Sequence, residues 1–256
     1  VVEASLREWP LDLLRDRARG WEPVVEDAGR RSWCYLRRCA WPAEVLQEEF
    51  QLLRSGVNWQ ALHSRQGQVT RSTAWFVSGA CRCCYSYGDV VVQPRSRPAW
   101  LERIEARVLG EGCGLDPGEW PDSVNLNLYE HEGQNVGWHS DDETLFGGCV
   151  QDCCIISASW GAPRSFEVAI KDLSHASGKP SIFKETVRSV VLNAGDLVSM
   201  EGLFQRHYSH QLAKGATSVQ EQPPALPRVN LTWRYIAHHK PNCPLGHPAA
   251  GAGAMW

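Results

Sequence analysis

Residues 228–234 read Arg-Val-Asn-Leu-Thr-Trp-Arg, with polar and apolar side chains in alternation. Residues 125–129, Asn-Leu-Asn-Leu-Tyr, alternate in the same sense. A period of two is typical of a β-strand with one polar and one apolar face. The two polar faces either meet solvent or converge in the mouth of a barrel. In the second case Arg228 and Arg234 would suit a dicarboxylate, because guanidinium groups match carboxylate geometry and keep their charge when partly buried.

Around these two strands, the second half of the chain reads as a series of short β segments. They are SVNLNLYEH at 123–131, CIISASWG at 154–161, RSFEVAI at 164–170, SVVLNAGDLVSMEG at 189–202, RHYSHQL at 206–212 and PRVNLTWRYIA at 227–237. Two helices are expected before them, one from Pro42 to about Gly56 and one from Ala99 to Leu109. This order of elements predicts a mostly β fold with supporting helices, either a barrel or a two-sheet jelly roll.

The length of 256 residues suits one catalytic domain with an extension at each end. Residues 1–40 show no sustained period, so we expect a loosely structured N-terminal extension. We assign residues 41–98 to a helix plus a substrate-recognition region of short strands and loops. Residues 99–237 form the predicted β domain, and residues 238–256 are expected to be a C-terminal tail.

Composition excludes two classes of protein. The formal net charge of −3 argues against a protein that coats nucleic acid through bulk electrostatics. No apolar run approaches the roughly 18 to 20 residues needed to cross a bilayer, and charges occur throughout the first 20 residues, unlike a signal peptide. We therefore expect a soluble protein of the nucleus and/or cytoplasm that has no membrane partner.

The ten cysteines of the chain include two local clusters. Neither cluster has the paired CxxC spacing that is typical of structural zinc sites, so we interpret both as reduced thiols. The segment from Cys243 to His247 gives only a weak indication of a metal site. The clusters comprise Cys81, Cys83 and Cys84, and Cys149, Cys153 and Cys154.

A possible metal site begins in the segment Gly-Trp-His-Ser-Asp-Asp-Glu. His139 and Asp141 are two residues apart, so in an extended chain both side chains project to the same side. The later segment from Gln205 to His210 offers two candidates for a third ligand, His207 and His210, and the pattern alone does not choose between them. Two histidines and one carboxylate form the facial triad of non-haem iron oxygenases, which leaves positions open for a 2-oxo acid and O2.

Four segments together resemble the AlkB family of nucleic-acid dealkylating dioxygenases. They are NLNLYEHEGQNVGWHSDDE at 125–143, ISASWGAPRSFEV at 156–168, GDLVSMEGLFQRHYSHQL at 195–212 and PRVNLTWR at 227–234. The resemblance extends over about residues 41–237, and the WHSDDE form is most similar to members that repair DNA and RNA. It implies a double-stranded β-helix, that is, a jelly-roll core. It also selects His210 over His207, because in the family the second histidine precedes a stretch like Leu212-Ala213-Lys214.

The resemblance further implies a role for individual residues. His139, Asp141 and His210 are the expected Fe(II) ligands and catalytic centre. One of two arginines is expected to hold the distal carboxylate of 2-oxoglutarate while the other lies near the metal, but the sequence does not show which. The expected 2-oxoglutarate contacts are Asn127, Tyr129, Arg228, Asn230, Thr232 and Arg234, and the expected substrate contacts are Tyr85, Tyr87, Asp142, Trp75 and Arg71.

The activity implied by the family is the oxidative demethylation of bases such as 1-methyladenine and 3-methylcytosine in DNA and/or RNA. Fe(II), 2-oxoglutarate and O2 are used, and succinate, CO2 and formaldehyde are released. No side chain stands out as a finger for insertion into a duplex, so we expect a slight preference for single strands, and we expect a monomer. Two alternatives are the same chemistry on an RNA modification or a protein side chain, and a non-catalytic module that binds nucleic acid.

Overall fold

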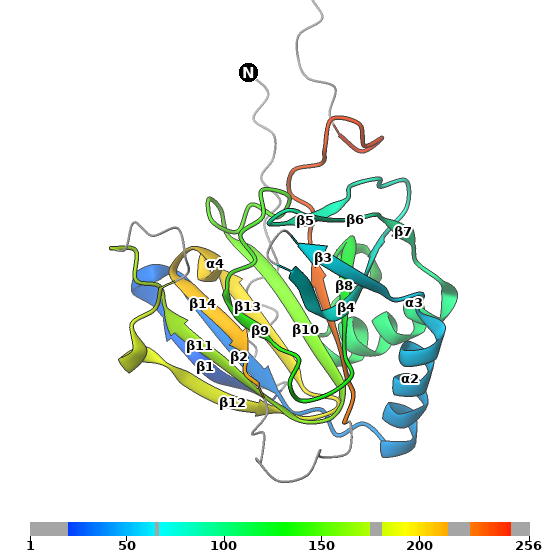
Figure 1. The fold of residues 1–256 in the computed structure, drawn as a ribbon, viewed down its shortest axis with the longest axis horizontal. Helices are drawn as coiled ribbons and strands as arrows, with labels where there is room; N and C mark the ends of the chain where they lie inside the picture. The colour runs from blue at the N-terminus through cyan, green and yellow to red at the C-terminus, as the bar shows by residue number, and fades with distance from the viewer. Residues whose placement is uncertain (1–19, 65–66, 175–180, 215–225, 247–256) are drawn as a thin grey trace, which may run out of the picture.

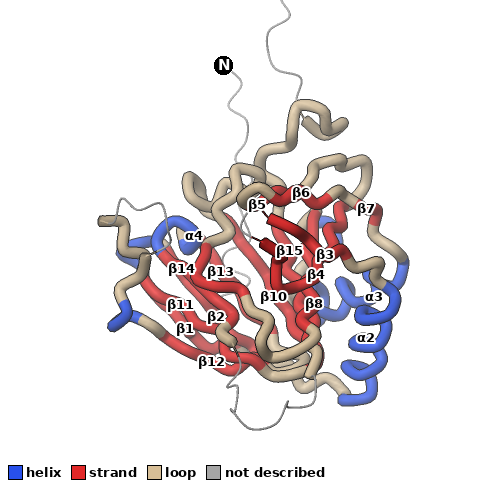
Figure 2. Tube along the Cα trace, viewed as in Figure 1, coloured by secondary structure: helices blue, strands red, loops and turns tan. Residues whose placement is uncertain are grey.

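The computed structural model describes residues 20–64, 67–174, 181–214 and 226–246, and it consists mainly of two facing β-sheets (Figures 1 and 2). The larger sheet has nine strands in the order β1-β2-β13-β10-β15-β8-β4-β3, with β7 paired to β4. Its strands are β1 (Trp21–Asp27), β2 (Ser32–Arg37), β3 (Gln60–Ser64), β4 (Gly67–Val77), β7 (Arg95–Ser96), β8 (Ser123–Tyr129), β10 (Cys153–Gly161), β13 (Leu197–Gly202) and β15 (Arg228–Arg234).

The smaller sheet has four strands in the order β12-β11-β14-β9. These are β9 (Val136–His139), β11 (Arg164–Ile170), β12 (Arg188–Leu192) and β14 (Tyr208–Leu212). Between β8 and β15 the chain passes back and forth between the two sheets, which is the arrangement of a jelly roll. The predicted fold class, mostly β with a double-stranded β-helix core, is therefore confirmed.

The larger sheet is buried on both faces, and the alternation of polar and apolar residues determines which side chains lie on each face. Every residue of β8 and β15 is buried. Val229, Leu231 and Trp233 of β15 pack with the leucines of β8 in a core cluster on one face of the sheet. The polar residues of both strands therefore point to the other face, between the two sheets, rather than into solvent.

Two helices cover the apolar face of the larger sheet. Helix α2 (Ala43–Gly56) matches the prediction, and α3 (Ala99–Glu105) starts where expected but passes into a π-helical segment, Ala106–Gly112. Each helix sends a buried carboxylate to a tryptophan of the sheet: the indole of Trp160 donates to Glu49 at 3.0 Å, and that of Trp233 donates to Glu105 at 2.8 Å. No helix within the described residues has the length and apolar character to cross a membrane.

The N-terminal part of the domain differs from the expectation of a loose extension. Residues 21–37 form the β1–β2 hairpin, and β2 pairs antiparallel with β13. Because short strands with mixed polarity carry a weak pattern, the absence of a period was misleading here. The first 19 residues of the predicted extension lie outside the described residues.

Strand β14 is shorter than predicted, because its first residues are helical. The segment Phe204–His207 forms the short helix α4, and the strand begins only at Tyr208. The predicted β segment at 206–212 is therefore a strand only from Tyr208 on: His207 ends the helix, and only His210 belongs to β14.

A third group of elements packs beside the mouth of the jelly roll. It contains the small sheet of β5 (Tyr85–Tyr87) and β6 (Val90–Val92), as well as the chain that follows β15. Buried residues from both parts, including Tyr85, Ile236 and Cys243, form a separate core cluster together with Trp75 of β4. Residues 238–246 of the expected tail are thus part of the folded domain, and residues 247–256 lie outside the described residues.

Gly161, the last residue of β10, is expected to tolerate no side chain. Its φ is +84°, and an added Cβ would overlap the backbone oxygen of Pro227 and lie 2.8 Å from the ring of Phe50. We predict that Gly161→Ala lowers the free energy of unfolding by roughly 2 to 4 kcal/mol, because backbone strain and overpacking act together. Urea unfolding followed by circular dichroism measures this. The matched control is Gly118→Ala, because an added Cβ there meets nothing within 4 Å, and a similar loss in both variants would contradict the prediction.

Candidate active site

A cavity of about 770 Å³ lies between the two sheets, and residues of the β5–β6 region also line it. Its size falls within the range of about 300 to 1,000 Å³ that is typical of small-molecule sites. All the predicted site residues except Trp75 line it. They are His139, Asp141, His210, Asn127, Tyr129, Arg228, Asn230, Thr232, Arg234, Tyr85, Tyr87, Asp142 and Arg71.

The predicted metal ligands meet at one point of this cavity. His139 in β9 and His210 in β14 are register partners on neighbouring strands, and their ring centroids are 4.2 Å apart. One carboxylate oxygen of Asp141 lies 3.8 Å from His139 Nε2 and 4.0 Å from His210 Nε2. A metal ion about 2.1 Å from each ligand atom can be reached by all three. His207 is not part of this group, so the structure brings together the three residues that the resemblance selected.

The protonation of the three side chains suits a divalent cation. His139 Nδ1 lies 2.8 Å from the backbone oxygen of Gly137, so Nδ1 carries the proton and Nε2 keeps its lone pair toward the site. Burial lowers the pKa of His139, and it lowers the pKa of His210 to about 3 with help from the neighbouring His139. Both rings are therefore neutral, as metal ligands must be.

Asp141 is held in its ionised form by Arg234. Arg234 Nη2 and Nε donate to one carboxylate oxygen at 2.7 and 3.1 Å, which leaves the other oxygen facing the histidines. Burial opposes ionisation, but the charge and hydrogen bonds of Arg234 outweigh it and lower the pKa of Asp141. The backbone N–H of Asp141 donates to Gln205 Oε1 at 2.9 Å, which fixes the loop after β9. Arg234 therefore lies at the metal end of the cavity.

Arg228 is a buried cation without an acidic partner among the described residues. Its side chain is buried, its Nη2 donates to Ser159 Oγ at 2.6 Å, and its Nε has no hydrogen-bond partner. Burial lowers the pKa of Arg228 to about 10. An isolated buried charge is costly unless a ligand of opposite charge compensates it. The donor set of Arg228 therefore fits a carboxylate group of a bound ligand.

The remaining polar residues of β8 and β15 form a hydrogen-bonded lining between the two arginines. Asn230 Nδ2 donates to Ser157 Oγ and to the backbone oxygen of Ala158, both at 2.8 Å, and its Oδ1 accepts from Thr232 Oγ1 at 3.1 Å. Asn127 Oδ1 accepts from Arg71 Nε at 3.0 Å. The ring of Tyr129 lies 5.6 Å from the guanidinium carbon of Arg228. This lining holds the side chains in place without filling the cavity.

Two tyrosines form an aromatic wall beside the metal ligands. The rings of Tyr85 and Tyr87 are 5.3 Å apart, and Tyr85 donates to Glu143 Oε1 at 2.8 Å. The guanidinium of Arg71 lies 5.4 Å from the ring centre of Tyr87. Burial raises the pKa of Glu143 to about 7, and the negative charge of Asp141 adds to this effect. Asp142 is exposed at the mouth of the same cavity.

Trp75 does not take the place predicted for it. It is fully buried behind the wall, stacked on Tyr85 with ring centroids 5.0 Å apart, and its indole donates to the backbone oxygen of Cys83 at 2.8 Å. The expectation that Trp75 contacts a substrate is therefore corrected: Trp75 supports Tyr85 from behind. The sequence alone did not show whether Trp75, in the middle of β4, faces the cavity or the core behind it.

Three residues of the site received no role from the sequence. Glu143 binds the hydroxyl of Tyr85, Ser159 accepts from Arg228, and Gln205 binds the backbone of Asp141. Glu143 is part of the quoted His-Ser-Asp-Asp-Glu motif, so its position was a usable signal. Ser159 and Gln205 gave no such signal, because their roles depend on strand pairing and on the helical turn of α4.

Comparison with known proteins adds independent findings. Residues 36–234 match the sequence profile of the 2OG-Fe(II) oxygenase superfamily. The human protein "Alpha-ketoglutarate-dependent dioxygenase alkB homolog 3" is 31% identical over 208 residues, which are 78% of this chain and 66% of the human protein. "DNA oxidative demethylase ALKBH2" of Arabidopsis thaliana is 30% identical over 132 residues, 47% of this chain and 39% of that protein. A solved structure titled "The structure of OsALKBH1" has a TM-score of 0.48 and 18% identity, and the match covers 80% of this chain and 96% of that one.

Proposed function

Because this chain belongs to the 2OG-Fe(II) oxygenase superfamily, and within it to the AlkB family, we propose that it demethylates N-alkylated bases such as 1-methyladenine and 3-methylcytosine. It is an AlkB-type dioxygenase that uses Fe(II), 2-oxoglutarate and O2. When bound, the iron supplies the oxidation, in which 2-oxoglutarate becomes succinate and CO2 and the methyl group leaves as formaldehyde. The protein itself positions the reactants and excludes water.

One observation carries the proposal: a single cavity contains the metal ligands, the uncompensated Arg228 and the tyrosine wall. His139, Asp141 and His210 would hold the iron. Arg234 is bound to the metal carboxylate, so we assign the distal carboxylate of 2-oxoglutarate to Arg228. The wall of Tyr85 and Tyr87 is then left for the substrate.

The chemistry of the wall supports a methylated base as the substrate. Aromatic rings provide stacking surfaces for bases, and enzymes that modify a base take it out of its stack into such a pocket. The hydroxyl of Tyr87 is buried without a hydrogen-bond partner among the described residues, so it is available to a ligand. Methylation at N1 of adenine or N3 of cytosine leaves a positive charge on the base, and the carboxylate of Asp142 at the mouth attracts such a charge.

We also propose a preference for single strands and a monomeric enzyme. An unpaired base costs less to extrude than a paired one. Three arginines that could have contacted a second strand bind other residues of the domain instead. Arg71 donates to Asn127, Arg95 to the backbone of Asn58, and Arg97 to Glu105 and the backbone of Pro121. The residues that line the cavity all belong to this chain, so the proposed chemistry needs no residue from a second copy.

A panel of methylated oligonucleotides tests the proposal. We expect formaldehyde release from single-stranded DNA and/or RNA that carries 1-methyladenine or 3-methylcytosine, and slower release from duplex DNA. Unmethylated oligonucleotides of the same sequences are the control. Succinate formation without formaldehyde from any methylated nucleic acid would refute the substrate and would point to another acceptor, such as a protein side chain.

Replacement of Tyr87 tests the aromatic wall. We expect Tyr87→Ala to raise KM for the methylated oligonucleotide roughly 5- to 100-fold, because stacking of one base contributes about 1 to 3 kcal/mol. Tyr87→Phe keeps the ring and is the matched control, with a smaller rise that reports on the hydroxyl alone. KM for 2-oxoglutarate should stay constant in both variants. An unchanged oligonucleotide KM in Tyr87→Ala would contradict the assignment.

A further inference from the structure

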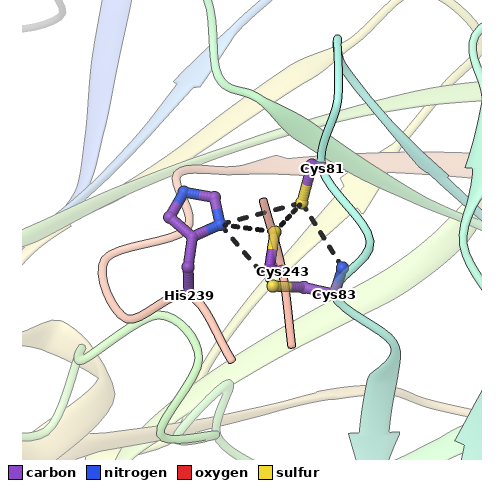
Figure 3. A group of neighbouring side chains, drawn as sticks. All are labelled: Cys81, Cys83, His239 and Cys243. Atoms are coloured by element: carbon purple, nitrogen blue, oxygen red, sulfur yellow. Dashed lines mark hydrogen bonds between the residues drawn. The ribbon is translucent and has the colours of Figure 1, made fainter. Parts of the chain in front are cut away.

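Four potential metal ligands outside the active site converge from two distant parts of the chain (Figure 3). Cys81 and Cys83 lie in the segment between β4 and β5, and His239 and Cys243 lie in the segment after β15. Their ligand atoms are all within 4.8 Å of one another. Among the described residues, this is one of two such groups, and the other is the iron triad.

The distances between these atoms fit a metal ion with tetrahedral coordination. His239 Nδ1 lies 3.8 Å from the sulfur of Cys81 and 3.5 Å from each of the sulfurs of Cys83 and Cys243, and the Cys81 and Cys243 sulfurs are 3.9 Å apart. Zinc bonds of about 2.3 Å to sulfur and 2.05 Å to nitrogen, at tetrahedral angles, place sulfur about 3.6 Å from nitrogen and about 3.8 Å from another sulfur. One ring nitrogen has a single lone pair or proton and cannot serve three thiols, whereas a central ion can.

The backbone around the cluster directs N–H groups at the sulfurs. The sulfurs of Cys81, Cys83 and Cys243 each accept a backbone N–H, from Cys83 at 3.5 Å, Lys240 at 3.3 Å and Arg82 at 3.3 Å. Hydrogen bonds to sulfur stabilise the thiolate, which is the form that binds a metal ion.

We propose that Cys81, Cys83, His239 and Cys243 bind one zinc ion in a closed tetrahedral site. Three thiolates and one imidazole are soft ligands that select zinc over the oxygen-preferring cations, and such a set without an open position is typical of a structural site. A disulfide is a poorer account, because the cysteines are free and a bond between Cys81 and Cys243 would use only two of the four converging ligand atoms.

The site would hold the aromatic wall of the active site in place. Cys83 accepts the indole N–H of Trp75 and lies two residues before Tyr85, which stacks on Trp75. On the other side of the cluster, Lys240 lines the cavity. The zinc ion would therefore tie the wall to the chain that follows β15, across more than 150 residues of sequence.

Metal analysis of the full chain tests the proposal. To exclude zinc in the iron site, the measurement uses the His210→Ala variant, which we expect to retain about one zinc per chain after dialysis against a weak chelator. Adding Cys83→Ser should reduce the content to below about one tenth. Cys84→Ser is the matched control, because the neighbouring Cys84 donates to Gln93 and is not part of the cluster, so its zinc content should stay at about one.

X-ray absorption at the zinc edge keeps the test independent of how the variants fold. The His210→Ala protein should show three sulfur neighbours at about 2.3 Å and one nitrogen at about 2.05 Å. Absence of zinc, a shell of nitrogen and oxygen alone, or a disulfide between Cys81 and Cys243 found by mass spectrometry would each overturn the proposal.

Discussion

Replacing His210 with alanine is expected to reduce succinate formation by at least roughly a thousandfold, while the affinity for a methylated oligonucleotide stays within a few fold. His210 is one of three side chains that converge on the metal position, and it is 6% exposed. Loss of a ligand removes the ion or its correct placement. A bound ion contributes several kcal/mol to stabilisation of the transition state, and about 1.4 kcal/mol corresponds to a tenfold change in rate. Succinate release and fluorescence anisotropy measure the two quantities separately.

The control for this variant is His207→Ala, three residues earlier in the chain. His207 ends helix α4, does not line the cavity and is only partly buried. It should leave the rate of succinate formation within about twofold, and thermal unfolding of both variants shows that they are folded. Normal turnover in His210→Ala, or an equal loss in His207→Ala, would reject the assignment of the third ligand.

Replacing Arg228 with methionine is expected to raise KM for 2-oxoglutarate by roughly 100-fold or more. A charge-assisted hydrogen bond contributes about 1.5 to 3 kcal/mol, and a guanidinium can donate two to one carboxylate. Arg228→Lys keeps a charge but loses the forked geometry, so its KM should lie between those of the other two proteins. Arg103→Ala, an exposed arginine on the helical side of the domain, is the control.

The thermal stability of Arg228→Met is a second measurement, and we expect it to stay the same or rise while the affinity for 2-oxoglutarate falls. Arg228 has no acidic partner among the described residues, so its burial in the ligand-free protein is unfavourable. Methionine has a similar volume and no charge, so Arg228→Met should unfold at the same or a higher temperature than the wild type. Added 2-oxoglutarate should stabilise the wild type only. A variant that unfolds earlier and still responds to 2-oxoglutarate would show that Arg228 is structural.

The sequence predicted that β8 and β15 each have one polar and one apolar face, because they alternate over their whole length, but it did not show that the polar faces are buried. That pattern correctly placed Asn127, Arg228 and Arg234 on one face, and the same period put His139 and Asp141 on one side. The choice of the third ligand needed the family resemblance. The physical reason for it is strand register, since His210 is the residue that β14 places opposite His139.

Features that depend on pairing between distant segments could not be predicted from local patterns. Cys81 and Cys83 read as ordinary thiols, because their partners His239 and Cys243 are more than 150 residues away. The face on which Trp75 lies depends on which neighbour covers β4, and the sequence of β4 alone does not show this. The assignment of Arg228 and Arg234 to separate ends of the cavity required the ion pair with Asp141.

The β1–β2 hairpin limits how far the chain can be truncated from its N-terminal side without damage to the domain. Without it, β13 would have unbonded N–H and C=O groups along one side, and such a strand is a template for pairing with another molecule. The hairpin also supplies Asp27, which accepts the hydroxyl of Tyr208 at 2.9 Å at the start of the strand that contains His210. A fragment beginning near residue 40 would therefore be prone to self-association and would lose a support beneath its own catalytic strand.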